Sequence, residues 1–165
     1  MTSSTTNNTA TDDIQSYLDR GLRNYWYPVA PSWQVGNAPV GITRLGDQIV
    51  LWRDQEGHVH ALEDRCPHRG ARLSLGWNLG GSVACWYHGI EIDGGGTVTK
   101  VPAVSACPLE GTKCVKSYPV EEHAGAIFLW FGDDAHQQPA PLVLPEELVG
   151  DEDRSFLCMS SWKWN

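Results

Sequence analysis

From Trp26 onward, the chain alternates short apolar runs with clusters of turn residues. The runs are rich in Ile, Val and Leu and are too short for helices, so they favour β-strands. Gly46-Asp47 and residues 54–57 are typical of the turns between such strands. The pattern predicts antiparallel strands at Ile42–Leu45, Gln48–Arg53, His58–Glu63, Ser82–Trp86, Ile90–Asp93, Thr97–Val101, Lys116–Glu122 and Ala126–Phe131.

The glycine and proline content indicates the class of fold. The chain has 17 glycines and 10 prolines among these short strands, which is typical of an all-β sandwich or barrel. Asp12-Asp13 can cap a short helix before the first strand. The apolar residues of that helix, at helical spacing, are Ile14, Tyr17, Leu18 and Leu22. We therefore predict an antiparallel β-sandwich that follows a short N-terminal helix.

The two ends of the chain differ in composition from its middle. Residues 1–13 are rich in Ser, Thr and Asn, and we expect a disordered tail there. Residues 14–133 carry the helix and strand signals, and their number suits one domain. Residues 134–165 begin as a linker with three prolines and end in the apolar, aromatic run Phe156–Asn165. That run predicts the beginning of a further domain.

The charge of the chain excludes two classes of partner. Lys and Arg number 12 and Asp and Glu number 20, giving a net charge of -8 at pH 7. Nucleic acids and anionic membrane surfaces both require a positive face, so we expect neither as a partner. No apolar run approaches the roughly 20 residues that cross a bilayer. The N-terminal tail also lacks the features of a secretory signal.

The cysteine count indicates the redox environment. The chain has 5 cysteines, an odd number, without a secretory signal. This favours a reducing cytoplasm, where cysteines are more often metal ligands than disulfide partners. A disulfide between Cys107 and Cys114 is geometrically possible but is disfavoured by that environment. We expect Cys158 to be a small core residue.

Two short boxes combine a cysteine with a histidine. The first is Cys66-Pro67-His68-Arg69-Gly70, and the second is Cys85-Trp86-Tyr87-His88-Gly89. Each box comes at the end of a predicted strand, so two loops can approach one site from opposite sides. Two thiolates and two imidazoles are good ligands for a transition metal.

Three interpretations of the boxes are open. Two Cys and two His can bind a structural zinc, but zinc fingers usually group Cys with Cys and His with His. A chance coincidence does not account for the glycine that ends each box. A [2Fe–2S] centre in which two Cys hold one iron and two His hold the other requires one ligand of each kind from each loop. The mixed boxes favour this last interpretation.

The boxes resemble those of the Rieske iron–sulfur family. Arg69-Gly70 and Trp86-Tyr87 are similar to one branch, the oxygenase subunits of ring-hydroxylating, non-haem iron oxygenases. The resemblance covers about residues 23–133. It also includes Tyr25–Val29, Val50–Asp54 and Tyr118–Glu122.

The resemblance implies a Rieske-type sandwich with a small cluster-binding subdomain and a specific set of ligands. Cys66 and Cys85 would hold the inner iron, and His68 and His88 the outer, solvent-side iron. Respiratory Rieske proteins carry an extra Cys in each box and a Ser after the second, where this chain has Ala71, Tyr87 and Ile90. With neither the disulfide nor the hydroxyl, we expect a low reduction potential, about −150 mV.

The resemblance also implies a role in an oxidoreductase. A ferredoxin or flavin reductase would supply electrons, and the cluster would pass them to a mononuclear Fe(II), commonly in an adjacent subunit of a trimer. That iron activates O2 for mono- or dioxygenation of an aromatic substrate, and two His and one carboxylate hold it. His123 and His136 do not match this triad, so we expect a Rieske domain whose catalytic domain begins near Ser160–Asn165 and is cut short.

Other interpretations of the whole chain and of single residues follow from the same sequence. A free-standing Rieske ferredoxin and a zinc-stabilised interaction module are the two alternatives. His58 and His60 are expected on a solvated strand face. Arg69 is expected to contact an acidic residue of a neighbouring subunit, and Trp86 to shield the cluster from water.

Overall fold

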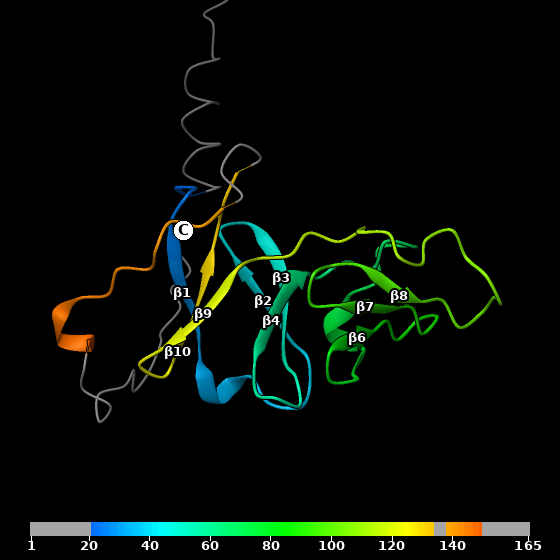
Figure 1. The fold of residues 1–165 in the computed structure, drawn as a ribbon, viewed down its shortest axis with the longest axis horizontal. Coiled ribbons are helices and arrows are strands. Elements are labelled where there is room, and N and C mark those ends of the chain that lie inside the picture. Colours follow the sequence, from blue (N-terminus) through cyan, green and yellow to red (C-terminus); the bar gives the residue numbers. More distant parts are fainter. Residues whose placement is uncertain (1–20, 134–137, 150–165) are drawn as a thin grey trace, which may run out of the picture.

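The computed structural model describes residues 21–133 and 138–149, in which ten short strands form three antiparallel sheets. The sheets have the orders β1-β10-β9, β2-β3-β4 and β5-β6-β7-β8 (Figure 1). Three 3-10 turns, η1 (Ser32–Gln34), η2 (Leu73–Leu75) and η3 (Glu146–Leu148), accompany them. The strands are β1 (Trp26–Pro31), β2 (Val40–Arg44), β3 (Asp47–Arg53), β4 (Val59–Glu63), β5 (Trp77–Asn78), β6 (Ser82–Ala84), β7 (Glu91–Asp93), β8 (Val98–Lys100), β9 (Val120–His123) and β10 (Ala126–Trp130).

One hydrophobic core lies between the first and second sheets. Val29, Ile127 and Leu129 from β1 and β10 enter it from one side, and Ile49 and Leu51 from β3 enter it from the other. Side chains from two packed sheets form the core of a sandwich. The predicted all-β, antiparallel sandwich is therefore confirmed.

Strand β3 is buried on both of its faces. Ile49 and Leu51 belong to the sandwich core, whereas Val50 and Trp52 belong to a second core shared with the third sheet. Successive side chains of a strand face opposite sides, which explains this division. All four side chains are 0% exposed. The unbroken apolar run Ile49–Trp52 is what a strand between two layers requires.

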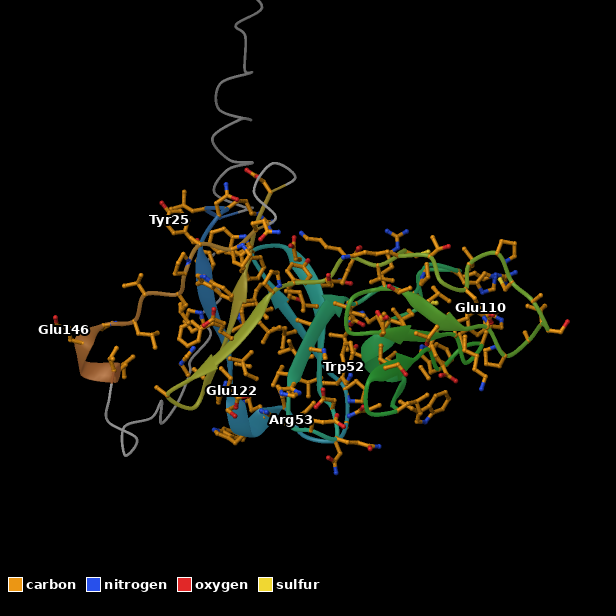
Figure 2. The ribbon with its side chains drawn as sticks, in the orientation of Figure 1. Tyr25, Trp52, Arg53, Glu110, Glu122 and Glu146 are labelled. Carbon is orange, nitrogen blue, oxygen red and sulfur yellow. The ribbon has the colours of Figure 1, made fainter. Side chains whose placement is uncertain are left out.

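Trp52 joins β3 to the small subdomain, which we define as residues 65–115 and which contains the third sheet (Figure 2). Its Nε1 donates a hydrogen bond to the carbonyl of Gly80, between β5 and β6, at 3.1 Å. Its ring stacks on that of His60, with centroids 5.2 Å apart. The hydrogen bond between His60 and Asp54 in turn lowers the pKa of Asp54 to about 2. The small subdomain is thus held by a specific hydrogen bond as well as by apolar packing.

The prediction of one continuous strand at Lys116–Glu122 is wrong, because the first part of this segment pairs with the second sheet and the last part with the first sheet. The N–H of Tyr118 donates to the Ala61 carbonyl of β4 at 3.0 Å, so this part pairs with the second sheet. Pro119 has no N–H to continue that pairing. The chain then crosses to β10 and forms β9 against it. This crossing closes one side of the sandwich.

The predicted helix falls mostly outside the described residues. Gly21 and Leu22, the first that the structure describes, are not helical: Gly21 has a φ of 64° and Leu22 is 70% exposed. The predicted tail 1–13 and the aromatic run Phe156–Asn165 also lie outside. In the described part of the chain, no helix has the length and apolar character needed to cross a membrane.

One carboxylate at the start of β3 connects segments that are far apart in the sequence. Asp47 accepts hydrogen bonds from the Arg23 guanidinium (2.9 and 3.1 Å) and from the Tyr118 hydroxyl (2.9 Å), and Lys116 Nζ lies 3.5 Å away. Burial opposes ionisation of this carboxyl group. The hydrogen bonds from Arg23 and Tyr118 outweigh it and lower the pKa of Asp47. One ionised side chain therefore joins Arg23, which precedes β1, to the start of β3 and to the segment that contains Lys116 and Tyr118.

We expect Asp47→Asn to lower the free energy of unfolding by about 1–2 kcal/mol near neutral pH, because it weakens these charged hydrogen bonds. The pKa of Asp47 is lowered in the folded state, so its contribution is complete above the unfolded pKa of about 4. The contribution disappears as the pH falls through the lower, folded-state pKa. Urea unfolding of both proteins at about pH 7 and about pH 2.5 should show a smaller difference at the acidic pH. An undiminished difference would contradict this role.

Candidate metal centre

The two Cys–His boxes form turns with matching backbone hydrogen bonds. In the first, the Cys66 carbonyl accepts from the Gly70 N–H at 2.9 Å, and the Cys66 N–H donates to the Ala71 carbonyl at 2.8 Å. The second box repeats both bonds between Cys85 and residues 89–90, at 2.8 and 2.9 Å. Each box is therefore a closed loop that begins at its cysteine and presents its histidine near the tip.

A glycine closes each loop for a conformational reason. Gly70 and Gly89 each have a φ of 70°. This left-handed conformation costs other L-residues roughly 1–2 kcal/mol. The turn that closes each box therefore favours glycine at its last position, where the sequence has Gly70 and Gly89.

The four predicted ligands come together with the thiols inside and the imidazoles outside. Cys66 and Cys85 are 3% and 1% exposed and belong to the second core. His68 and His88 are exposed, and their Nδ1 atoms lie 3.3 Å apart. One pair can hold a metal ion at the edge of the core, and the other pair can hold one at the surface.

The surroundings of Cys66 suit a thiolate that is bound to a metal. Burial, aided by the neighbouring Cys85 thiol, raises the pKa of the Cys66 thiol to about 11. The backbone N–H groups of His68 and Arg69 act in the opposite direction by donating to the sulfur. A bound metal cation displaces thiol protons and supplies the charge that an apolar core lacks. The donors around this sulfur therefore fit a metal-bound thiolate.

The donors divide two and two rather than converging on one point. The Cys66 and Cys85 thiols are neighbours within the second core, whereas the His68 and His88 Nδ1 atoms lie 3.3 Å apart at the surface. A tetrahedral zinc requires all four ligands around one ion. A two-iron centre with two protein ligands on each iron requires separate pairs, completed by inorganic sulfide. The donor set fits the two-iron centre.

Asp64 supports the first loop, and the sequence did not identify it. This residue is 3% exposed and is the buried charged residue of the described part of the chain. Its carboxylate accepts hydrogen bonds from the backbone N–H and the hydroxyl of Ser74, at 2.7 and 2.6 Å. The bonds tie the end of β4 to η2, across the first box. The only signal in the sequence is an acidic residue two positions before Cys66.

The histidines of the β3–β4 hairpin do not join the site. His58 is 76% exposed, as predicted for a solvated position. The prediction is wrong for His60, whose Nε2 lies 2.8 Å from Asp54 and whose ring stacks on Trp52. His60 therefore serves the packing of the small subdomain.

The remaining candidates also lie apart from the boxes. His123, in β9, pairs with the Glu121 carboxylate at 2.9 Å. Cys107 and Cys114 are free thiols, so the disulfide that the sequence disfavoured is not formed. Trp86 is 47% exposed and stacks on Tyr87, outside the buried thiol pair. His136 and Cys158 lie outside the described residues.

We expect Gly89→Ala to lower the amount of bound iron per chain. The new Cβ would stand at a φ of 70° and 3.4 Å from Pro102 Cγ, in the loop that carries His88. The matched control is Gly57→Ala, which has a φ of 92° and no atom within 4 Å of the new Cβ, in the β3–β4 turn. Both variants should lose about 1–2 kcal/mol of stability. Iron analysis should show a loss in Gly89→Ala alone, and an equal loss in both would contradict the role of the turn.

Comparison with known proteins identifies the family. Residues 25–119, which include both boxes, match the family model described as Rieske [2Fe-2S] domain. The vanillate O-demethylase oxygenase subunit of Pseudomonas sp. (strain HR199 / DSM 7063) is 41% identical over 118 residues. The match covers 72% of this chain and 32% of that protein.

Solved structures show the same similarity in three dimensions. The terminal oxygenase of carbazole 1,9a-dioxygenase from Novosphingobium sp. KA1 has a TM-score of 0.72 at 35% identity, over 86% of this chain and 39% of that one. The reduced complex between oxygenase and ferredoxin in carbazole 1,9a-dioxygenase has a TM-score of 0.73 at 27% identity, over 90% and 40%. The chain thus spans well under half of these relatives. The matching boxes, the sandwich and these similarities place the chain in the Rieske [2Fe–2S] domain family, among relatives of Rieske oxygenase subunits.

Proposed function

We propose that this domain carries single electrons within a Rieske-type, ring-hydroxylating oxygenase. The observation that carries the proposal is the pair of buried thiols beside the pair of exposed imidazoles. Cys66 and Cys85 would hold the inner iron of a [2Fe–2S] cluster, and His68 and His88 would hold the outer iron. Such a cluster supplies one-electron redox chemistry when it is bound.

The protein's own residues would give the site two unlike sides. The second core surrounds Cys66 and Cys85 and keeps water from their sulfur atoms. The Nδ1 atoms of His68 and His88 lie 3.3 Å apart and both residues are exposed, so the histidine pair has an edge open to solvent. A redox partner can reach this edge without entering the core. We therefore propose that electrons enter and leave on the histidine side.

We infer the partners from the relatives. The carbazole 1,9a-dioxygenase structure contains an oxygenase with a ferredoxin, which supports a ferredoxin, or a flavin reductase with the same role, as the donor. The acceptor would be a mononuclear iron held by two His and one carboxylate in a catalytic domain, in an adjacent subunit of a trimer. That domain would hydroxylate an aromatic compound with O2. A cytoplasmic location is part of the same proposal.

A free-standing Rieske ferredoxin is the second candidate, since its boxes would be arranged in the same way. The segment after β10 favours the oxygenase. Trp26 Nε1 donates to the Ala140 carbonyl at 2.6 Å, so this segment returns to β1 and is hydrogen-bonded to it. The relatives described above are oxygenase subunits, which supports the same choice.

The first test concerns the metal. The chain, purified without oxygen, should contain iron and acid-labile sulfide in equal amounts, about two of each. Cys66→Ser and Cys85→Ser should each abolish the cluster, because a hydroxyl is a poor substitute for a soft thiolate ligand. Cys114→Ser, at an exposed free thiol, is the control and should keep it. Zinc in a stoichiometric amount without sulfide would refute the assignment.

The second test concerns the reaction. With dithionite as donor and O2 as acceptor, the cluster-loaded 165-residue chain should be reduced and reoxidised, with changes in visible absorption at each step. It should not hydroxylate an aromatic compound, because we assign O2 activation to a separate catalytic domain. Product analysis by mass spectrometry measures this. A hydroxylated product formed in proportion to the electrons consumed would show that the assignment is wrong.

A further inference from the structure

The two Cys–His loops share the same inner turn, but their bases are held differently. In the second box, Ala84 and Glu91 lie directly outside the turn and are paired with each other between β6 and β7. The backbone ladder of these strands therefore runs up to the loop and fixes both of its ends. The chain that leaves the first box enters the 3-10 turn η2 instead of a strand. The two ends of the first loop must therefore be held together by another contact.

The Asp64 carboxylate supplies this contact at the base of the first loop. One of its oxygens accepts a hydrogen bond from the Ser74 N–H at 2.7 Å, and the other accepts from the Ser74 hydroxyl at 2.6 Å. Residues 65–73, which include Cys66 and His68, lie between the two bonded residues. One side chain thus does for the first loop what the β6–β7 ladder does for the second.

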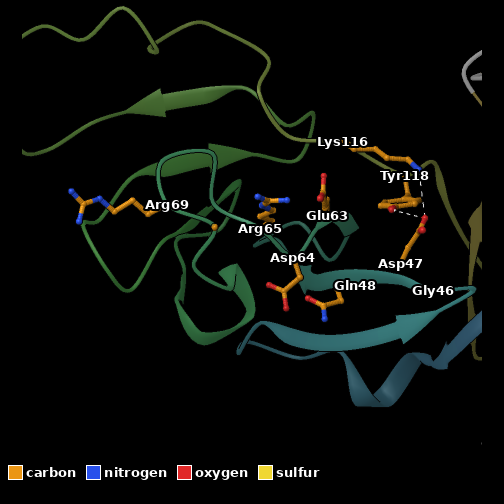
Figure 3. Close-up of a pocket in the computed structure, with 10 residues that line it drawn as sticks. Gly46, Asp47, Gln48, Glu63, Asp64, Arg65, Arg69, Lys116 and Tyr118 are labelled. Carbon is orange, nitrogen blue, oxygen red and sulfur yellow. Dashed lines mark hydrogen bonds and ion pairs between the residues drawn. The ribbon is translucent and has the colours of Figure 1, made fainter.

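Asp64 is itself attached to the second sheet. Its N–H donates to the Gln48 carbonyl of β3 at 2.9 Å, and Figure 3 shows the two side chains next to each other. A Cβ built at Gly41 of β2 would lie 2.7 Å from Ser74 Oγ and 3.3 Å from Asp64 Oδ2, so the β2 backbone covers the contact. Asp64 is 3% exposed, so little water competes with Ser74 for its oxygens. The first loop is therefore anchored to the sandwich through one buried side chain.

We propose that Asp64 is a positioning residue for the cluster: through Ser74 it keeps the first loop, with Cys66 and His68, in a fixed place relative to the second loop. The proposal rests on the proposed electron-transfer function and adds a residue outside the ligand set. Cys66 and His68 are assigned to different irons, so a loosened first loop would disturb both irons. The second loop should keep its place, because its base is held by strands.

This role depends on hydrogen-bond geometry and not on charge, and substitutions separate the two. The oxygen of an asparagine can accept from the Ser74 N–H, and its NH2 group can donate to the Ser74 hydroxyl, which is both a donor and an acceptor. An alanine can do neither. Asp64→Asn should therefore retain the position of the loop, and Asp64→Ala should lose it.

The experiment measures the release of iron from the folded, cluster-loaded chain to a ferrous chelator in the presence of dithionite. The variants are Asp64→Ala, Asp64→Asn and Ser74→Ala; the last removes one bond only and decides the matter if Asp64→Ala does not fold. The matched control is Asp93→Ala in the same subdomain. Asp93 Oδ1 accepts from the N–H groups of Gly95 and Thr97 at 2.9 and 2.8 Å, in a turn that carries no predicted ligand.

We expect iron release to be about tenfold faster in Asp64→Ala and a few-fold faster in Ser74→Ala, because buried hydrogen bonds to a carboxylate are lost. Release should stay within about twofold of the unmodified chain in Asp64→Asn and Asp93→Ala. The EPR lines of the reduced cluster should broaden in the same order, because loosely held ligands give a range of geometries.

Three results would overturn the proposal. Equally fast release in Asp64→Ala and Asp93→Ala would show a general loss of stability. Unchanged release in both Asp64→Ala and Ser74→Ala would show that the contact does not position the loop. Release in Asp64→Asn as fast as in Asp64→Ala would show that the charge matters and the geometry does not.

Amide hydrogen exchange provides a second readout that does not require a cluster. In Ser74→Ala, the Gly70 N–H, which donates to the Cys66 carbonyl, should exchange faster than in the unmodified chain. The Gly89 N–H of the second box should exchange at an unchanged rate. Equal acceleration at the two glycines would contradict a selective effect on the first loop. Failure of the unmodified chain to assemble a cluster would instead overturn the proposed function itself.

Discussion

Strand β3 supplies side chains to two cores at once, and the position of the metal site depends on it. Ile49 and Leu51 fill the sandwich, while Val50 and Trp52 support the small subdomain that carries both Cys–His loops. Because Ile49–Trp52 of β3 are fully buried, neither core can shift without disturbing the other. The Trp52 hydrogen bond to Gly80 adds a directional contact to this apolar packing. The sandwich therefore acts as a base that fixes the two loops relative to each other.

The loops convert this fixed position into an asymmetric site. Each loop starts at a cysteine that belongs to the second core and reaches solvent at its histidine. The matching turns, each closed by a left-handed glycine, repeat this arrangement on both sides of the site. The two thiols are thus held away from water, and the two imidazoles are held at the surface. In the proposed function, electrons would be exchanged through the histidine side of this arrangement.

Much of the fold and the site is readable in the sequence, for identifiable reasons. The apolar run at Ile49–Trp52 predicts β3 because a strand between two layers is apolar at every position. The four candidate ligands are predicted by the spacing of Cys and His within each box. Strand β5 was missed because it has only the residues Trp77–Asn78, too few for a visible alternation.

Other features depend on contacts that have no local signature. Asp47 meets Tyr118, which is 71 positions away along the chain, and Asp64 meets Ser74 across the first loop. The change of partner sheet at Tyr118 depends on where β4 and β10 lie, which the strand pattern does not encode.

Mössbauer spectroscopy of the oxidised chain, loaded with isotopically enriched iron, tests the central claim most directly. Two buried thiolates and two exposed imidazoles, divided between two irons, predict two quadrupole doublets of equal area with different isomer shifts, because nitrogen and sulfur ligands donate different electron density. His68→Cys/His88→Cys, which offers four thiolates, should bring the two doublets together if a cluster still assembles. A single doublet from the unmodified chain would mean that the irons have equivalent ligands, and it would contradict the assignment of Cys66, His68, Cys85 and His88.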